Sequence, residues 1–185
     1  MTGEAAIAVR PARGADDIAA ATRLAWEFVD FLNHRYPEMR EEIAAYLKDQ
    51  RFAEMLAEFP RWFNPPAGEC MLATRDGLAI GIVMLKPSTA PAAGRACEMN
   101  RMFVTPSARR LGVGRVLCAA LIAEAARLGY DEMRLSALDR HDEALPLYRS
   151  LGFAHDRHAP PSPAGARAID MKLSLPSLAP SAPAP

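Results

Sequence analysis

The amino-acid sequence predicts a single domain of mixed α/β class, built on a twisted mixed sheet of six to seven strands with about four flanking helices. The first observation is the order of hydrophobic patterns, which reads strand, two helices, three strands, helix, strand, helix, two strands, without an internal repeat. The second is size, because 185 residues, 50% of them hydrophobic, suit one sizeable core. We therefore expect one domain over residues 1–175 and a disordered Pro/Ala/Ser-rich tail at 176–185.

The N-terminal part is expected to hold one strand and two helices. Residues 5–12 read as the strand. Asp16 and Asp17 are typical of the start of a helix, and apolar residues at helical spacing continue it to about Asn33. Pro37 breaks this pattern, and a more polar helix is expected over residues 41–58.

The middle of the chain predicts three strands and a long helix. Residues 69–87 read as a hairpin whose turn is Asp76-Gly77, since this pair readily takes the positive φ angles of a two-residue turn. Residues 96–104 form the next strand, and a helix starts near Gly112 and ends at Gly129. The expected buried stripe of that helix consists of Val113, Val116, Leu117, Ala120, Leu121 and Leu128.

The C-terminal part predicts a strand at residues 130–138, a short helix within 141–153, and two last strands at 153–157 and 166–175. Pro146 is compatible with the short helix because it lies in the first turn, where a backbone N–H has no partner to lose.

Composition restricts the classes of function. Lys plus Arg and Asp plus Glu both number 22, so the neutral chain gives no global attraction to nucleic acid or membranes. The three cysteines, Cys70, Cys97 and Cys118, lie in apolar segments without disulfide or zinc spacing, which favours reduced core thiols and a cytoplasmic location. No apolar run is as long as a membrane span, and residues 1–17 lack a signal-peptide pattern.

The segment from Met102 to Arg115 predicts an anion site. Glycines at the start of a helix let backbone N–H groups approach an anion, and the helix N-terminus adds partial positive charge. The forked donors of Arg109, Arg110 and Arg115 suit phosphate oxygens. A P-loop is excluded by the missing Gly-Lys-Ser/Thr, and a dinucleotide fingerprint by the leucine at position 117. A glycine-rich loop with solvated arginines remains the alternative.

This segment resembles the signature [QR]-x-x-G-x-[GA] of the GNAT superfamily of acetyltransferases, here residues 109–114. The resemblance continues upstream in "CEMNRMFVTPSAR", similar to the acyl-CoA strand, and downstream in "ALPLYRSLGF", similar to A-x-x-L-Y-x-x-x-G-F. Small bacterial acetyl-CoA-dependent N-acetyltransferases are the most similar type, with a Glu in that strand and a Y-x-P-P-like turn, here residues 63–66.

The resemblance implies a GNAT-like fold and acetyl-CoA as the acetyl donor, without a metal. It implies that the pyrophosphate binds on the backbone N–H groups of Arg110, Leu111, Gly112, Val113 and Gly114, and that Arg109 and Arg115 add charge. Arg109 is alternatively a brace for the loop. The pantetheine arm would pair with the backbone of Met102, Phe103 and Val104 as an added strand does.

Two residues are candidates for catalysis. The resemblance places Tyr148 near the thioester sulfur, where a phenol that keeps its proton at neutral pH can protonate the departing thiolate; the alternative is a core aromatic. Glu98 is the candidate base for the amine, directly or through water. Its alternatives are an ion pair with an arginine such as Arg101, or a solvated position.

The acceptor is expected to be a small-molecule or amino-acid-like amine, for an enzyme that is a monomer or homodimer. His141 stands where many relatives have Asn, and a Pro-rich segment at 158–166 stands where such relatives carry tyrosines and an Asn. A protein acetyltransferase and a non-catalytic acyl-CoA-binding module remain alternatives.

Overall fold

The structure, a computed structural model, describes residues 6–90, 92–159 and 167–176 and contains one seven-stranded mixed sheet. The strand order is β1-β2-β3-β4-β5-β7-β6, and neighbouring strands are antiparallel except β4 and β5, which are parallel. The strands are β1 (Ala8–Pro11), β2 (Glu69–Arg75), β3 (Leu78–Pro87), β4 (Ala96–Val104), β5 (Glu132–Leu138), β6 (Ala154–His155) and β7 (Ala168–Ser174). The predicted mixed α/β class and strand number are confirmed, whereas the predicted tail at 176–185 lies outside the described residues except for Pro176.

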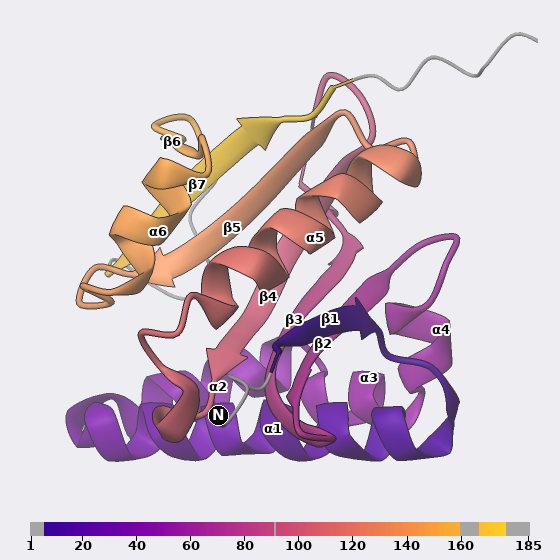
Figure 1. Cartoon of the computed structure of the whole chain (residues 1–185). Coiled ribbons are helices and arrows are strands. Elements are labelled where there is room, and N and C mark those ends of the chain that lie inside the picture. The colour runs from indigo at the N-terminus through magenta and orange to yellow at the C-terminus, as the bar shows by residue number, and fades with distance from the viewer. Residues whose placement is uncertain (1–5, 91, 160–166, 177–185) are drawn as a thin grey trace, which may run out of the picture.

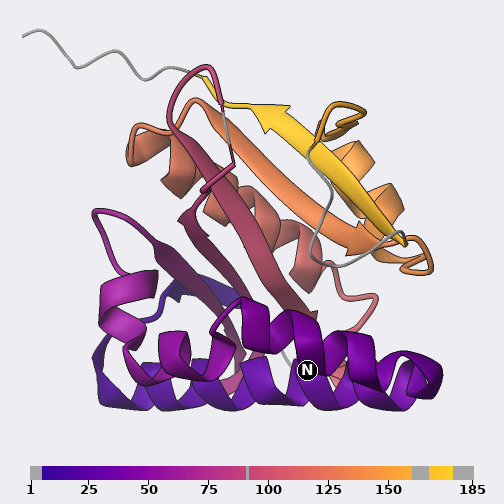
Figure 2. The ribbon, with the colours of Figure 1, turned by 180° about the vertical axis from the view of Figure 1, so that it is seen from behind.

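Helices cover both faces of this sheet (Figures 1 and 2). They are α1 (Gly14–Arg35), α2 (Arg40–Asp49), α3 (Phe52–Ala57), α4 (Phe59–Phe63), α5 (Val113–Arg127) and α6 (Ala144–Ser150), with 3₁₀ turns η1 (Pro37–Met39) and η2 (Pro106–Ala108). On one face, α5 and α6 pack over a core that includes Leu117, Leu121 and Met133. On the other, α1, α3 and α4 enclose a second core around Leu24, Phe59 and Ile82. None of the described helices has the length and apolar character needed to cross a membrane.

The prediction of a single helix over residues 41–58 is wrong. Two short helices, α2 and α3, replace it because Arg51 takes a left-handed conformation with φ of 50°. Glu58 then leaves the helical region, and α4 follows beyond the predicted range. Helical periodicity does not reveal such a break, since the apolar spacing continues on both sides of it. The six helices therefore exceed the four expected.

Helix α5 has one error in its predicted stripe. Val116 is 47% exposed, whereas Val113, Leu117 and Leu121 are buried against the sheet. The buried residues advance by four along the helix, which turns position 116 away from the sheet. Two turn predictions hold: Asp76 and Gly77 have φ of 52° and 76° at the hairpin, and Gly129 has φ of 79° after α5.

Strands β4 and β5 pair only at their first three positions, from Ala96↔Glu132 to Glu98↔Arg134. Beyond them the two strands diverge, as the ribbon shows (Figure 1). A bulge in β4 accompanies this separation, because its register with β3 shifts between Ile82 and Met84 and Arg101 takes a φ of 52°. Bulges of this kind redirect side chains near functional sites.

A buried ion pair joins the first helix to the sheet. Arg13, just before α1, donates two hydrogen bonds of 2.8 and 2.7 Å to the carboxylate of Glu69, which is fully buried. Glu69 also accepts a bond from the N–H of Cys70. The sequence gives no sign of this pairing, because the two residues are distant along the chain and the glutamate opens an apolar strand.

We expect Arg13→Met to lower the free energy of unfolding by about 2 kcal/mol, since it leaves a buried carboxylate without its cation. The Arg13 side chain is 42% exposed, which limits the loss. The double variant Arg13→Met/Glu69→Gln should recover most of it, as no charge is then buried. Urea unfolding measures both; a single variant within about 0.5 kcal/mol of the native chain would contradict the expectation.

Candidate active site

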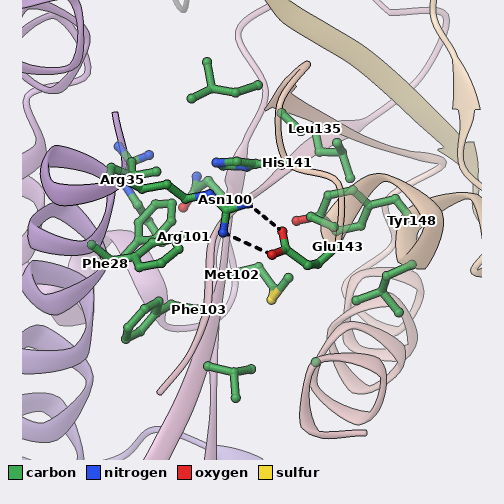
Figure 3. A pocket seen from close by; sticks show the side chains of 18 of the residues that line it. Phe28, Arg35, Asn100, Arg101, Met102, Phe103, Leu135, His141, Glu143 and Tyr148 are labelled. Atoms are coloured by element: carbon green, nitrogen blue, oxygen red, sulfur yellow. Dashed lines mark hydrogen bonds and ion pairs between the residues drawn. The ribbon is translucent and has the colours of Figure 1, made fainter. Parts of the chain in front are cut away.

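A cleft of about 1040 Å³ occupies the region where β4 and β5 diverge. Its walls come from α1 and α2 on one side and from α6 and the first turn of α5 on the other (Figure 3). All the site residues predicted from the sequence line it except Leu111, which is 44% exposed and lies outside it. Chain folding therefore brings the predicted anion loop, the predicted acyl-CoA strand and both candidate catalytic residues to one continuous space.

The floor of the cleft is the second half of β4. Because the pairing of β4 with β5 ends at Glu98, the edge of Met102, Phe103 and Val104 that faces β5 is free of a strand partner among the described residues. Unpaired backbone N–H and C=O groups of this kind can bind an extended ligand as an added strand would. This fits the pantetheine arm of acetyl-CoA.

The predicted anion loop forms the N-terminal end of α5. Arg110 and Gly112 have positive φ angles of 63° and 78°, and Gly112 caps the helix. These angles turn the loop so that α5 starts at the cleft, where its N-terminal N–H groups and macrodipole favour an anion. Arg110 is exposed at this end and lines the cleft.

The other two arginines of the loop already have partners. Arg109 lies over the Phe31 ring at 4.4 Å and donates from Nε to the carbonyl of Val104, a contact suited to the bracing role. Arg115 donates to the hydroxyl of Ser150 at 2.9 Å, which ties α5 to α6. Positive charge therefore gathers at this end of the cleft, where Arg110 and Arg115 are both exposed.

Gly114 provides a test of whether a ligand fits between β4 and α6. A β-carbon at this position would lie 3.3 Å from Leu147 Cδ2, 3.7 Å from Met102 Sδ and 3.9 Å from Val104 Cγ2. Only glycine leaves this passage open, and its backbone is helical rather than strained. The residues present thus fit an extended acyl-CoA that runs from the anion loop along β4.

Tyr148 lies at the centre of the cleft. Its ring is buried in the α5–α6 core, with an edge contact to Phe153 at 6.0 Å, and its hydroxyl points into the cleft (Figure 3). Burial raises the pKa of Tyr148 above its ordinary value of about 10, so the phenol holds its proton throughout the physiological range. The ring is therefore a core aromatic, and the hydroxyl of the same residue faces the cleft.

Glu98 lines the cleft at the end where β4 and β5 still pair. Its carboxylate lies 3.4 Å from the ammonium of Lys86, which also donates to Gln50 at 2.8 Å. The cation beside Glu98 is therefore Lys86, on the neighbouring strand, rather than the Arg101 that the sequence suggested.

Sequence reasoning missed an ion pair that crosses the cleft. Arg35 reaches from the end of α1 to Glu143 at the start of α6, with N–O distances of 3.0 and 3.3 Å (Figure 3). Arg140 pairs with Glu38 nearby at 2.7 Å. These contacts link elements more than 100 residues apart, and no local pattern could have predicted them.

His141 also faces the cleft, in the loop before α6. Its ring stacks at a tilt on Tyr36, 5.7 Å between centroids, and its backbone carbonyl accepts the first hydrogen bonds of α6. Burial, and secondarily the charge of Arg35, lower the pKa of His141, whereas Asp142 and Glu143 act in the opposite direction. The imidazole is therefore neutral at pH 7.

This shift predicts a pH-dependent stability difference between the native chain and His141→Gln. Because the folded pKa lies below the unfolded value of about 6.5, the stabilising contribution of neutral His141 is fully present above that pH and is lost as the pH falls below it. The native chain should therefore lose stability relative to His141→Gln between about pH 7.5 and 5. Urea midpoints at several pH values measure this; a constant difference would contradict it.

Within residues 6–90, 92–159 and 167–176, no group of three or more His, Cys, Asp or Glu side chains is placed to hold a metal ion.

The chain is similar in sequence to known acetyltransferases. Residues 28–153 match the model of the acetyltransferase (GNAT) family. An uncharacterized N-acetyltransferase of Schizosaccharomyces pombe is 37% identical over 118 residues, which cover 63% of this chain and 70% of that protein. Human N-acetylaspartate synthetase is 30% identical over 125 residues, 67% of this chain but only 40% of the human protein.

Solved structures share the same fold. The PaiA N-acetyltransferase of Thermoplasma acidophilum, in complex with coenzyme A, superposes with a TM-score of 0.65 at 16% identity, covering 91% of this chain and 99% of that one. A phosphinothricin acetyltransferase of Sinorhizobium meliloti, in complex with acetyl-CoA, gives 0.65 at 22% identity, covering 91% and 88%. With the family match and the cleft described above, we conclude that the chain belongs to the GNAT family of acetyltransferases and is an acyl-CoA-dependent acyltransferase.

Proposed function

We propose that this protein transfers the acetyl group of acetyl-CoA to the primary amine of a small, amino-acid-like acceptor by direct attack on the thioester. The observation that carries the proposal is the continuity of the cleft. It runs from the anion loop at Gly112, past the Tyr148 hydroxyl, to a polar end that contains Glu98. Both substrates can therefore meet at one point, as direct transfer requires.

Three groups of the chain supply the chemistry. Glu98 takes a proton from the acceptor ammonium, directly or through water, because only the free amine has a lone pair. A backbone N–H of the Met102–Val104 edge donates to the carbonyl oxygen as negative charge develops. Tyr148 gives its proton to the departing thiolate as the C–S bond breaks, and the proton that the new amide nitrogen loses restores the phenol.

A small acceptor is favoured over a protein chain by the mouth of the cleft. The Arg35–Glu143 ion pair crosses the cleft, and two of the three carboxylates that line the cleft, Glu98 and Glu143, already have cationic partners, which leaves only the exposed Glu42 among the described residues. A surface that recruits a lysine-rich protein would instead leave acidic side chains free. The relative named N-acetylaspartate synthetase supports an amino-acid-like acceptor for this chain.

A cytoplasmic location is also proposed. All three cysteines are buried free thiols, and burial raises the pKa of Cys97 and of Cys118 to about 12. Such thiols are unreactive and suit a reducing compartment.

The test is incubation of the purified protein with acetyl-CoA and a panel of primary amines, with free thiol release and the mass gain of one acetyl group as readouts. We expect turnover on at least one amine, and a loss of about a hundredfold in Glu98→Gln. Turnover unchanged in Glu98→Gln would remove Glu98 as the base. Acetyl-CoA binding without turnover on any amine would favour a non-catalytic acyl-CoA-binding module.

A further inference from the structure

Two buried side-chain polar atoms lack a hydrogen-bond partner among the described residues, Nε of Arg101 and Nε2 of His141. Both residues line the cleft. A buried donor or acceptor without a partner costs about 1–3 kcal/mol, and more when the group is charged, so such groups are rare in folded proteins. Their location in one cavity indicates that a bound molecule completes their hydrogen bonds.

Arg101 lies against two aromatic rings rather than against a carboxylate. It sits at the β4 bulge with a φ of 52°, which turns its side chain toward α2 and α3. There its guanidinium lies 4.6 Å from the centre of the Phe52 ring and 5.5 Å from that of Tyr46. Aromatic faces stabilise the charge, and the Tyr46 hydroxyl lies close enough to interact with the guanidinium, but among the described residues Nε of Arg101 remains without an acceptor and no carboxylate matches the forked N–H donors.

No carboxylate forms an ion pair with Arg101 in the described part of the chain. Three carboxylates of these described residues line the cleft: Glu98 pairs with Lys86 and Glu143 pairs with Arg35, whereas Glu42 is exposed on α2 and forms no ion pair with Arg101. The missing anion is therefore best supplied by a ligand.

We propose that Arg101 binds the carboxylate of the acceptor, so that the acceptor is an amino acid or a closely related amino-carboxylate. This inference rests on the proposed function and narrows its acceptor class. A carboxylate accepts two parallel hydrogen bonds from a guanidinium, a geometry that an amide or an alcohol cannot match.

The charges around Tyr46 agree with a zwitterionic ligand. Burial raises the pKa of the Tyr46 phenol; Arg101 opposes that shift and Glu98 reinforces it, so a positive and a negative group both lie near this ring. With its carboxylate on Arg101, an amino acid can direct its amine toward Glu98, the proposed base. Binding by charge at both ends selects against amines that have no carboxylate.

The experiment compares a series of amino acids with their α-carboxamides, in the native chain and in Arg101→Met. We expect the native chain to prefer each accepted acid over its amide by at least about tenfold in kcat/KM, and Arg101→Met to lose that preference while its KM for acetyl-CoA stays unchanged. Arg101→Met should also be at least as stable as the native chain, because it removes an unpaired buried cation; an arginine with a purely structural role would show the reverse.

Arg95→Met is the matched control, since Arg95 also stacks on an aromatic ring, Tyr130 at 4.7 Å, but lies outside the cleft and donates to two backbone carbonyls. It should leave the acid-over-amide preference intact. Arg101→Lys, which keeps the charge without the fork, should retain an intermediate preference and replaces Arg101→Met if that variant does not fold.

Thermal unfolding in the presence of the same acids and amides separates this inference from the proposed function. If no amine is turned over but acids stabilise the native chain and not Arg101→Met, the carboxylate site stands and the transferase proposal fails. Equal use of acids and amides by the native chain would overturn the inference. So would an unchanged preference in Arg101→Met, or the absence of both turnover and stabilisation by acids.

Discussion

Replacing Tyr148 by Phe is expected to lower kcat by about a hundredfold or more, with little change in stability or in the KM for acetyl-CoA. A positioned general acid contributes about 10²–10⁴ in rate, and the substitution removes only the hydroxyl that enters the cleft. The ring remains in the core against Phe153, so the packing of α6 is preserved. Steady-state kinetics with the best acceptor, together with thermal unfolding, measures both effects.

Tyr130→Phe is the matched control for this substitution. Tyr130 is buried to a similar extent, but its hydroxyl donates to the carbonyl of Ala67, and the residue does not line the cleft. We expect Tyr130→Phe to cost about 1 kcal/mol of stability through the lost hydrogen bond and to leave kcat unchanged. If Tyr148→Phe kept the native kcat, Tyr148 would be only a core aromatic and another group would protonate the thiolate.

Gly114→Val should weaken acetyl-CoA binding by about tenfold to a hundredfold while the unliganded protein remains as stable as the native chain. The added side chain fills the passage between Leu147 and Met102. When acetyl-CoA occupies the same space, the steric overlap destabilises the complex by about 1–3 kcal/mol. The unliganded protein is spared, because the end of the Leu147 side chain can move and valine is a better helix former than glycine. Calorimetric titration and thermal unfolding give the two quantities.

The control for Gly114→Val is Ala119→Val, which adds similar bulk on the exposed side of the same helix. It should bind acetyl-CoA as the native chain does. A substitution at Gly112 would not separate an effect on acetyl-CoA binding from an effect on stability. A β-carbon there would meet no atom within 4 Å, but the φ of 78° strains any other residue, so stability and binding would fall together. Native affinity in Gly114→Val would show that the ligand does not pass this residue.

The sequence correctly predicted the elements that are set by local backbone preferences. Asp76-Gly77 specified the hairpin, because few other residue pairs take two positive φ angles without strain. The run from 96 to 104 marked β4, and the glycines and arginines after it marked the start of α5. The break at Arg51 and the exposure of Val116 were not predicted, since both depend on how helices meet the sheet.

The part of the cleft around Glu98 and Arg101 separates even more clearly what local sequence can predict from what depends on tertiary contacts. Adjacent polar residues, Asn100 and Arg101, interrupt the alternation of β4 and were a signal for the bulge. The sequence could not show that Phe52 and Tyr46 would enclose the Arg101 guanidinium, or that Lys86 would pair with Glu98. Those partners come from other elements, and ion pairs carry no sequence periodicity.

The sequence by itself determined the mixed α/β class, the order of the strands and the glycine turn at the start of α5, because each follows from periodicity and from the backbone preferences of a few residues. Only the tertiary structure decided what that turn faces and where the buried charges lie. The reason is physical: the cleft exists where β4 and β5 cease to pair, and its charges are set by side chains that long-range packing brings together.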